Sequence, residues 1–302
     1  INLDNAITKW LTIGVNTSGS FTDFSGDAPS VDNIVTTSPL VTPTDANGDW
    51  VINPIGDFNV NPFLNSLADN YEVQSRLVGN FYTILKVPGL PGLSYRVNFG
   101  NNLKYFKTYS STPYGAGRTG EAFKNDATQY EQTLDNILNY VHSFGKHNIN
   151  ATAVYGYNTA DFNRTVARGT GFSDLNLSYN NLALAEIQKI DSEAWDEALL
   201  YQVGSIAYNY DSRYLFKATV RRDGFSGFSQ NNKTGIFPSV GVGWVVSEEK
   251  FFNLPAVDFF KIRGSYGENG NKVARYSSLA RVLAEESSKY VFGDGGSTSI
   301  GR

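Results

Sequence analysis

The residues of this sequence that could do chemistry form short motifs, each lacking some of the partners that its chemistry requires. Gly115 to Gly120 matches G-x-G-x-x-G, the glycine pattern of a dinucleotide-binding turn. That turn needs a buried strand directly before it and a helix directly after it. Here Ser110 to Pro113 intervenes, and the segment before alternates between apolar and polar residues. We therefore interpret the motif as a flexible loop tip.

A second motif resembles a calcium loop. Asp45, Asn47 and Asp49 have the spacing of the first three ligands of such a loop. Trp50 stands where the loop requires Gly, and Gly56 stands where it requires Glu. The sequence leaves two interpretations open, a bound calcium ion and a polar turn around Asn47.

The remaining candidates for catalysis are also incomplete. His142 and His147 are the two histidines of the chain, and no third ligand lies at metal spacing, so we interpret them as turn residues. Glu248–Glu249 and Glu285–Glu286 are paired in sequence, but neighbours on a strand point to opposite faces. No G-x-S-x-G nucleophile motif occurs. The sequence therefore predicts no enzyme, no cofactor and no catalytic metal.

Composition narrows the class of protein. The 302 residues carry a net charge of −4, which gives no reason to expect a nucleic-acid partner. Charged residues make up 18%, below the roughly 25% of an ordinary soluble domain. The longest apolar run, Val240 to Val246, is too short for a membrane helix. Because the chain contains no Met and opens at Ile1, we expect an internal piece of a longer protein.

Apolar and polar residues alternate with a period of two through much of the chain, which indicates strands with two different faces. The clearest expected strands are Tyr71 to Val87, Leu93 to Gly100, Tyr214 to Arg221, Val240 to Val246 and Phe260 to Tyr266. The segment containing Leu11, Ile13 and Val15 follows the same pattern, with weaker candidates at Tyr130 to Ser143, Asn148 to Asn158 and Leu199 to Tyr210.

The connections between these strands alternate in length. Short connections are expected at Pro88 to Gly92, Phe144 to His147, Asp211 to Arg213 and Glu248 to Val257, and long ones at Phe21 to Asn70, Ser110 to Thr128, Thr159 to Asp196 and Asp223 to Gly235. This alternation predicts an antiparallel up-and-down transmembrane β-barrel with short periplasmic turns and long extracellular loops. Strands of about 12 to 17 residues are long enough to cross a membrane. A helix over Asn180 to Leu200 is also expected, and a soluble carbohydrate-binding β-sandwich is the alternative fold.

Several segments resemble the SusC/RagA family of TonB-dependent outer-membrane transporters of Bacteroidetes. They arrive in the order of the family and cover most of Tyr71 to Phe292. The segments are Leu134 to Tyr140, Phe144 to Asn150, Asp211 to Phe216, Val220 to Gly224, Asn232 to Val240, Gly243 to Trp244, Ser247 to Phe252 and Lys261 to Gly267 with Gly270 and Asn271.

The resemblance implies a barrel of roughly 22 strands, closed by an N-terminal plug. It also implies a SusD-like surface lipoprotein as lid, and import of an oligosaccharide or peptide substrate energised through TonB. Residues 1–302 would then be a partial barrel of about nine or ten strands in outer-membrane lipid, without the plug and the closing strands. A passive porin or an adhesive barrel is the alternative function, and the sequence does not name the substrate.

Two sets of residues are the candidate contacts of such a barrel. If the apolar sets face lipid, the opposite lumen face includes these cations: Arg76, Arg96, Lys217, Arg221, Lys261 and Arg263. These could attract an anionic or hydroxyl-rich substrate, or pair with carboxylates of the plug. Four loop aromatics could bind sugar rings or the lid, or pack the loops together: Trp50, Tyr114, Phe172 and Tyr179.

The alternation also predicts positions on the lipid side. Val240, Val242, Trp244 and Val246 should face lipid, with Gly241 and Gly243 inward. Tyrosines near strand ends are expected in the aromatic girdles of a membrane barrel: Tyr71, Tyr82, Tyr157, Tyr208, Tyr210 and Tyr214.

Overall fold

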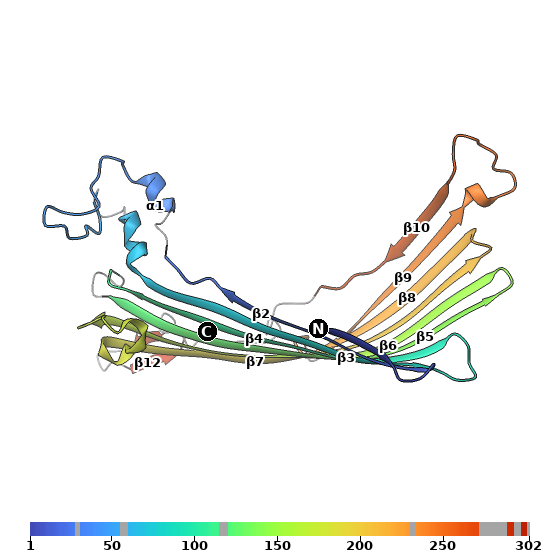
Figure 1. Ribbon diagram of the computed structural model, residues 1–302, viewed down its shortest axis with the longest axis horizontal. Helices are drawn as coiled ribbons and strands as arrows, with labels where there is room; N and C mark the ends of the chain where they lie inside the picture. The colour runs from blue at the N-terminus through green and yellow to red at the C-terminus, as the bar shows by residue number, and fades with distance from the viewer. Residues whose placement is uncertain are drawn as a thin grey trace.

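A computed structural model describes residues 1–27, 31–54, 60–114, 120–229, 233–271, 289–292 and 297–300. Ten strands form one sheet (Figure 1): β1 (Asn2–Ala6), β2 (Leu11–Asp23), β3 (Asp69–Lys86), β4 (Leu93–Thr112), β5 (Glu121–Phe144), β6 (His147–Phe172), β7 (Ala185–Tyr210), β8 (Tyr214–Phe225), β9 (Thr234–Val245) and β10 (Lys261–Gly267). Two short strands, β11 (Lys289–Phe292) and β12 (Ser297–Ile300), pair with each other.

Helical structure is confined to short segments in the described part of the chain. These are α1 (Val31–Thr36) and the 3-10 turns η1 (Pro62–Leu67), η2 (Ser178–Asn180), η3 (Leu182–Leu184) and η4 (Val246–Glu248). No described helix combines the length and the hydropathy that crossing a membrane requires.

The ten strands follow one another across the sheet in chain order, and each pairs antiparallel with the next. The predicted all-β, up-and-down antiparallel architecture is confirmed. The sheet remains open rather than closing into a barrel within the described residues.

Several strands are longer than predicted. β4 runs to Thr112 and β5 begins at Glu121, so more than half of the long loop expected at Ser110 to Thr128 is paired strand. β6 and β7 each contain 26 residues, so most of the loop expected at Thr159 to Asp196 is paired strand as well. The helix expected over Asn180 to Leu200 is wrong. Ile187 and Ile190 lie in β7 opposite Thr170 and Ala167 of β6, because hydrogen bonding to a neighbouring strand outweighs a weak helical spacing of apolar residues.

Because side chains alternate across a strand, the register assigns every paired residue to one of two faces. We call one the apolar face, which carries for example Leu77, Phe99, Leu134, Ile206, Phe216 and Val242. The other, the polar face, carries for example Arg76, Asn98, Asp135, Ser205, Lys217 and Gly241.

Apolar residues do not cover the whole length of the apolar face. On β5, β6 and β7 they are concentrated in a band over 134–144, 147–157 and 200–210. Each stretch is about 11 residues long, the length that a tilted membrane strand needs. Beyond it the same face carries Asp161 and Asp196, opposite each other on β6 and β7. The strands therefore project well past the apolar band.

The register of β9 places Val240, Val242 and Trp244 on the apolar face, opposite Ala218, Phe216 and Tyr214. Gly241 and Gly243 lie on the polar face. The prediction for Val246 is wrong, since β9 ends at Val245 and Val246 is buried in the 3-10 turn η4. A residue that leaves the strand no longer obeys its alternation.

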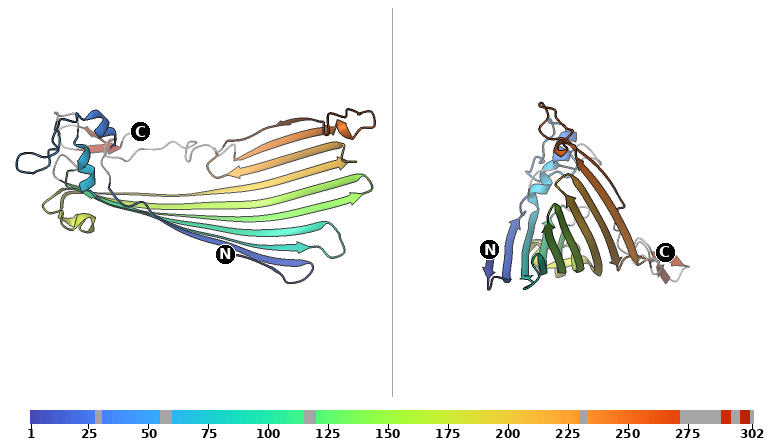
Figure 2. Two further views of the ribbon diagram at one scale, coloured as in Figure 1. Left: turned by 45° about the horizontal axis from the view of Figure 1, so that its top comes forward. Right: turned by 90° about the vertical axis from the view of Figure 1, so that its right-hand side faces the viewer.

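The short connections lie at one end of the sheet, and α1 and the loops between the long strands lie at the other (Figure 1 and Figure 2). An ion-pair chain joins three of the short connections. Lys146 Nζ lies 2.7 Å from Asp211 Oδ2, Arg213 Nη2 lies 3.5 Å from the same oxygen, and Arg213 Nη1 lies 3.6 Å from Glu249 Oε2.

Hydrogen bonds hold the Glu249 carboxylate in this chain. Tyr214 Oη donates to Glu249 Oε1 over 2.7 Å, and Trp244 Nε1 donates to the same oxygen over 3.1 Å. These donors stabilise the charged form, so they lower the pKa of Glu249 below its ordinary 4.5. A lowered carboxylate pKa contributes stability at higher pH that is lost as pH falls through the folded-state value.

We expect Glu249→Gln to lower the midpoint of thermal unfolding of the full-length protein near neutral pH, because two donors and Arg213 lose a charged acceptor. The difference from wild type should shrink as pH falls below 4.5. Differential scanning calorimetry in detergent measures both effects. Glu248→Gln is the matched control, since Glu248 forms no ion pair with a described residue. Equal effects of both variants would contradict this role for Glu249.

Candidate functional site

All six cations expected on one side of the sheet lie on the polar face. Arg76 and Arg96 come from β3 and β4, Lys217 and Arg221 from β8, and Lys261 and Arg263 from β10. Their surroundings divide them into two groups. Arg76, Arg96 and Arg221 are held by partners within the sheet. The other three cations line a hollow over β5 to β10.

Arg76 belongs to a network across β3, β4 and β5. Its Nε donates to Asn102 Oδ1 over 2.8 Å, and Asn102 Nδ2 donates to Glu131 Oε2 over 2.7 Å. Lys104 Nζ lies 3.4 Å from Glu131 Oε1, and Gln129 Nε2 donates to that same oxygen over 2.5 Å. The Glu131 carboxylate therefore accepts one side-chain amide hydrogen bond at each oxygen and balances the positive charge of Lys104.

Arg96 belongs to a cluster that spans β1 to β4. Gly14 of β2 lies directly opposite Tyr82 of β3, and a Cβ on Gly14 would lie 2.2 Å from the Tyr82 ring. Tyr82 Oη donates to Asp4 of β1. The Arg96 guanidinium lies 4.4 Å from the centroid of the same ring, and its Nε donates to Asn98 over 2.6 Å. The missing side chain of Gly14 makes room for the tyrosine.

Arg221 belongs to an equivalent cluster four strands later. Gly156 of β6 lies opposite Tyr201 of β7, and a Cβ on Gly156 would lie 2.2 Å from the Tyr201 ring. Tyr201 Oη donates to Asp135 of β5. Arg221 of β8 lies 4.9 Å from the ring centroid, and its Nε donates to Asp223 over 2.8 Å.

The two clusters share residue types, strand order and register. In each, Asp, Gly, Tyr and Arg come from four successive strands, and the arginine is bound by the residue two positions further along its own strand. The polar face thus contains a structural repeat of four strands. The sequence analysis missed it and assigned Tyr82 to an aromatic girdle. That assignment is wrong, because Tyr82 lies on the polar face opposite Gly14.

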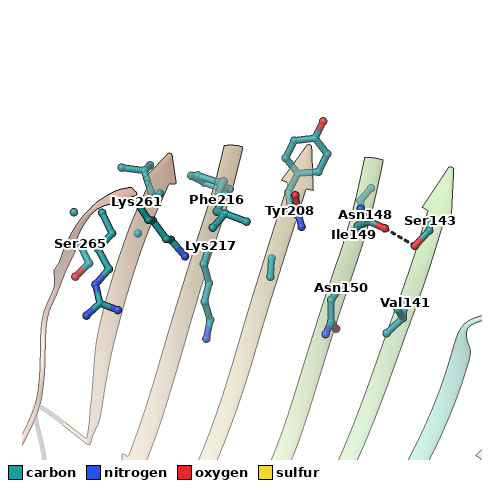
Figure 3. Close-up of a pocket in the computed structure, with 18 residues that line it drawn as sticks. Val141, Ser143, Asn148, Ile149, Asn150, Tyr208, Phe216, Lys217, Lys261 and Ser265 are labelled. Atoms are coloured by element: carbon teal, nitrogen blue, oxygen red, sulfur yellow. Dashed lines mark hydrogen bonds between the residues drawn. The ribbon is translucent and has the colours of Figure 1, made fainter. Parts of the chain in front are cut away.

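Lys217 and Lys261 line a hollow with a volume of about 780 Å³ (Figure 3), and Arg263 belongs to the same lining. Gly241 and Gly243 of β9 form part of its floor, and a Cβ on Gly243 would lie 3.2 Å from Lys261 Cε. Polar side chains complete the lining, among them Ser143, whose Oγ donates to Asn148 over 2.6 Å. None of the three cations forms an ion pair with a described residue. The hollow can therefore accept an anionic group.

The four candidate loop aromatics are half-buried rather than fully exposed. The Trp50 ring lies 6.5 Å from Phe63, and the Tyr179 ring lies 5.4 Å from Tyr109. Phe172 pairs with Ala185 at the end of β6. Tyr114 follows β4, directly before residues that the structure does not describe. The glycine motif at Gly115 to Gly120 lies outside the described residues, apart from Gly120 itself.

Tyr179 is fixed in a small aromatic cluster beyond the apolar band. The Tyr109 ring contacts the tilted rings of Tyr71 and Tyr179, at centroid distances of 5.5 and 5.4 Å. Burial, together with a 2.6 Å hydrogen bond to Asp126, raises the pKa of Tyr109 to about 12. Lys124 Nζ lies 4.9 Å from the Tyr109 ring. Tyr71 therefore packs in this cluster, beyond the apolar band that a girdle would border.

The Asp45 loop forms a tight turn closed on itself. Asp45 Oδ1 accepts hydrogen bonds from the backbone N–H groups of Asn47 and Asp49, at 2.8 and 3.0 Å. These bonds lower the pKa of Asp45. Within the described residues, no three His, Asp or Glu side chains are grouped as metal ligands.

Both histidines lie among aromatic rings at the short-turn end of the apolar face. The His147 ring lies 4.9 Å from Phe144 and 4.9 Å from Tyr210, and its Nδ1 lies 2.7 Å from Tyr208 Oη. His142 stacks on Tyr140 at 5.7 Å. This row of rings has the position and composition of an aromatic girdle.

The tyrosine clusters can be tested through Gly156. We expect Gly156→Ala to displace the Tyr201 ring, break its hydrogen bond to Asp135 and lower the free energy of unfolding by about 1.5 to 3 kcal/mol. In a double-mutant cycle with Tyr201→Phe, the two changes should be less than additive because both remove that bond. Denaturant unfolding of the full-length protein measures the cycle.

Gly100→Ala provides the matched control on the same face, because a Cβ there would lie 3.8 Å from its nearest neighbour. An additive cycle, or an equal loss in the control, would contradict this role for Gly156.

Comparison with known proteins gives a consistent family. The chain is 30% identical to TonB-dependent receptor P3 of Formosa agariphila, over 93% of this chain and 30% of the relative. It is 28% identical to TonB-dependent receptor SusC of Bacteroides thetaiotaomicron, over 82% of this chain and 25% of the relative. No family model matches the chain.

The fold is similar to that of solved transporters. The structure of the RagAB peptide transporter superposes with a TM-score of 0.79 and 21% identity, over 99% of this chain and 35% of that chain. The 'open-open' state of the RagAB peptide importer gives a TM-score of 0.78. The chain spans less than a third of the length of the curated relatives described above. In sequence and in fold, the chain is therefore similar to a segment of the β-barrel of SusC/RagA-type TonB-dependent receptors.

Proposed function

We propose that the chain forms part of the barrel wall of an outer-membrane nutrient importer. In this proposal, TonB supplies the energy, a SusD-like surface lipoprotein covers the entrance, and an oligosaccharide or a peptide is the cargo. The observation that carries the proposal is a ten-stranded sheet with an apolar and a polar face, in a chain related over most of its length to TonB-dependent receptors.

The two faces suit the two environments of such a wall. A band about 11 residues wide on the apolar face matches the hydrocarbon thickness that a tilted strand must cross. The polar face, which includes the six candidate cations, would line the lumen. Charges are costly toward lipid and are tolerated toward a polar interior.

The long ends of β4 to β7 would project from the outer surface. The Asp161–Asp196 pair lies beyond the band on the side that would otherwise contact lipid, which favours water around this part of the wall. Four aromatics lie at or near this end: Trp50 in the connection between β2 and β3, Tyr114 in the loop after β4, Phe172 as the last residue of β6, and Tyr179 between β6 and β7. They are the surface that we propose for contact with the lid or the cargo.

The hollow around Lys217, Lys261 and Arg263 brings together three cations that form no ion pair with a described residue. Carboxylates of an N-terminal plug are one group that would compensate it, and an anionic cargo is the other. A plugged barrel must satisfy the polar groups of its inner wall, which favours the plug. RagAB is a peptide transporter, and SusC is a TonB-dependent receptor. Neither name assigns a cargo to this chain.

Energy dependence tests the proposal against a passive porin. In cells that express the full-length protein, we expect labelled oligosaccharides or peptides to accumulate above their external concentration. Deleting TonB or collapsing the proton-motive force should abolish that accumulation, because a plugged barrel opens only when energy is supplied. Uptake from a mixed labelled pool, followed by mass spectrometry of the periplasm, measures it.

A strain that lacks the receptor is the control for other entry routes. Cargo that equilibrates across the membrane equally well without TonB would contradict import and indicate a pore. Surface binding without entry would indicate an adhesin.

A further inference from the structure

On the apolar face, β8 carries one charged side chain, that of Arg222. Arg221 lies on the polar face, where it pairs with Asp223, so the alternation places Arg222 on the opposite face. Arg222 follows Tyr214, Phe216, Ala218 and Val220 along the apolar side of the strand. It therefore lies where the apolar residues of β8 end. The cost of an arginine toward lipid falls steeply toward that interface.

A groove extends from Arg222 along the apolar face toward the short-turn end. It consists of two adjoining hollows of about 500 and 520 Å³, which share Leu138, Ala153, Gly204 and Val220. The floor is formed by small residues on three neighbouring strands: Ala151, Ala153, Gly204 and Ala218. Larger side chains border it, including Tyr140, Ile206 and Pro238.

The two ends of this groove differ in chemistry. At the Arg222 end, Arg222 Nη1 donates to Gln202 Oε1 over 3.2 Å, and Tyr95 Oη donates to Asn136 Oδ1 over 2.6 Å. All four residues line the first hollow. Arg222 forms no ion pair with any carboxylate of the described chain. At the other end, around Ala151 and Ala218, the lining is mainly apolar, with threonine and serine residues among it and no charged residue.

From this arrangement we infer that the groove binds a phosphate-bearing lipid of the outer leaflet, with its phosphate at Arg222 and an acyl chain over Ala153, Gly204 and Ala218. A guanidinium offers several donors to a phosphate in one plane, and the amides and the tyrosine beside it suit headgroup hydroxyls. The apolar remainder of the groove suits a hydrocarbon chain. The inference rests on the proposed placement of the apolar face in a membrane.

Lipid retention by the full-length protein tests the site. The protein is first inserted into phosphatidylcholine vesicles, and flotation confirms insertion. It is then extracted in detergent and titrated with dioleoyl phosphatidic acid or with dioleoylglycerol, which has the same chains without the phosphate. Native mass spectrometry counts the lipids that are retained.

We expect Arg222→Gln to weaken retention of phosphatidic acid about tenfold and to leave dioleoylglycerol unchanged, since a single charge-assisted phosphate contact is lost. Gly204→Leu, which fills the groove, should weaken both lipids. Lys107→Gln is the matched control, because Lys107 is an exposed cation of the same face outside the groove. It should change neither lipid.

Three outcomes would overturn the inference or its basis. Wild-type retention of phosphatidic acid by an inserted Arg222→Gln protein would overturn the lipid site alone. Equal losses in Arg222→Gln and Lys107→Gln would show general attraction of anions and overturn it as well. Failure of the wild-type protein to float with vesicles would overturn the proposed membrane placement together with the site.

Discussion

Backbone hydrogen bonds between successive strands join ten strands into one antiparallel ladder, and the position of every side chain depends on that ladder. With a side-chain period of two, a slip of one residue between two strands would move each residue of the slipped strand to the other face. The registers of successive strand pairs assign faces consistently across the sheet. Leu77, Phe99, Leu134 and Phe216 therefore share one face although they lie far apart in sequence. A wall with two environments requires this consistency.

The polar face contributes its own control of register. Tyr82 and Tyr201 each lie over a glycine of the preceding strand and donate to an aspartate one strand further. Such a contact can form in one register only, since a slip would place a Cβ under the ring. The arginine over each ring extends the cluster to a fourth strand. One cluster thus links β1 to β4 and the other links β5 to β8, both on the polar face.

The sequence predicted the features that depend on local pattern. Alternation identified the strands and the composition of the faces, and turn residues identified the short connections. The ends of β6 and β7 could not be predicted, because residues such as Ile187 and Ile190 are held in strand by pairing with β6. The tyrosine–glycine pairs and Arg222 were missed for a related reason. Their meaning depends on which residues lie opposite on other strands, and a single sequence does not give that register.

The central claim is that the two ends of this wall lie on opposite sides of an outer membrane, with the long-strand end outside. The 302-residue sequence contains no cysteine, so a thiol introduced at either of two exposed sites is the only one in this segment of the full-length protein, and the unsubstituted protein is the labelling control. Asn176 lies between β6 and β7, and Ser212 lies in the short turn between β7 and β8. A membrane-impermeant maleimide should label Asn176→Cys on intact cells, and should label Ser212→Cys only after the outer membrane is permeabilised. Labelling in the reverse order, or equal labelling of both on intact cells, would contradict the account.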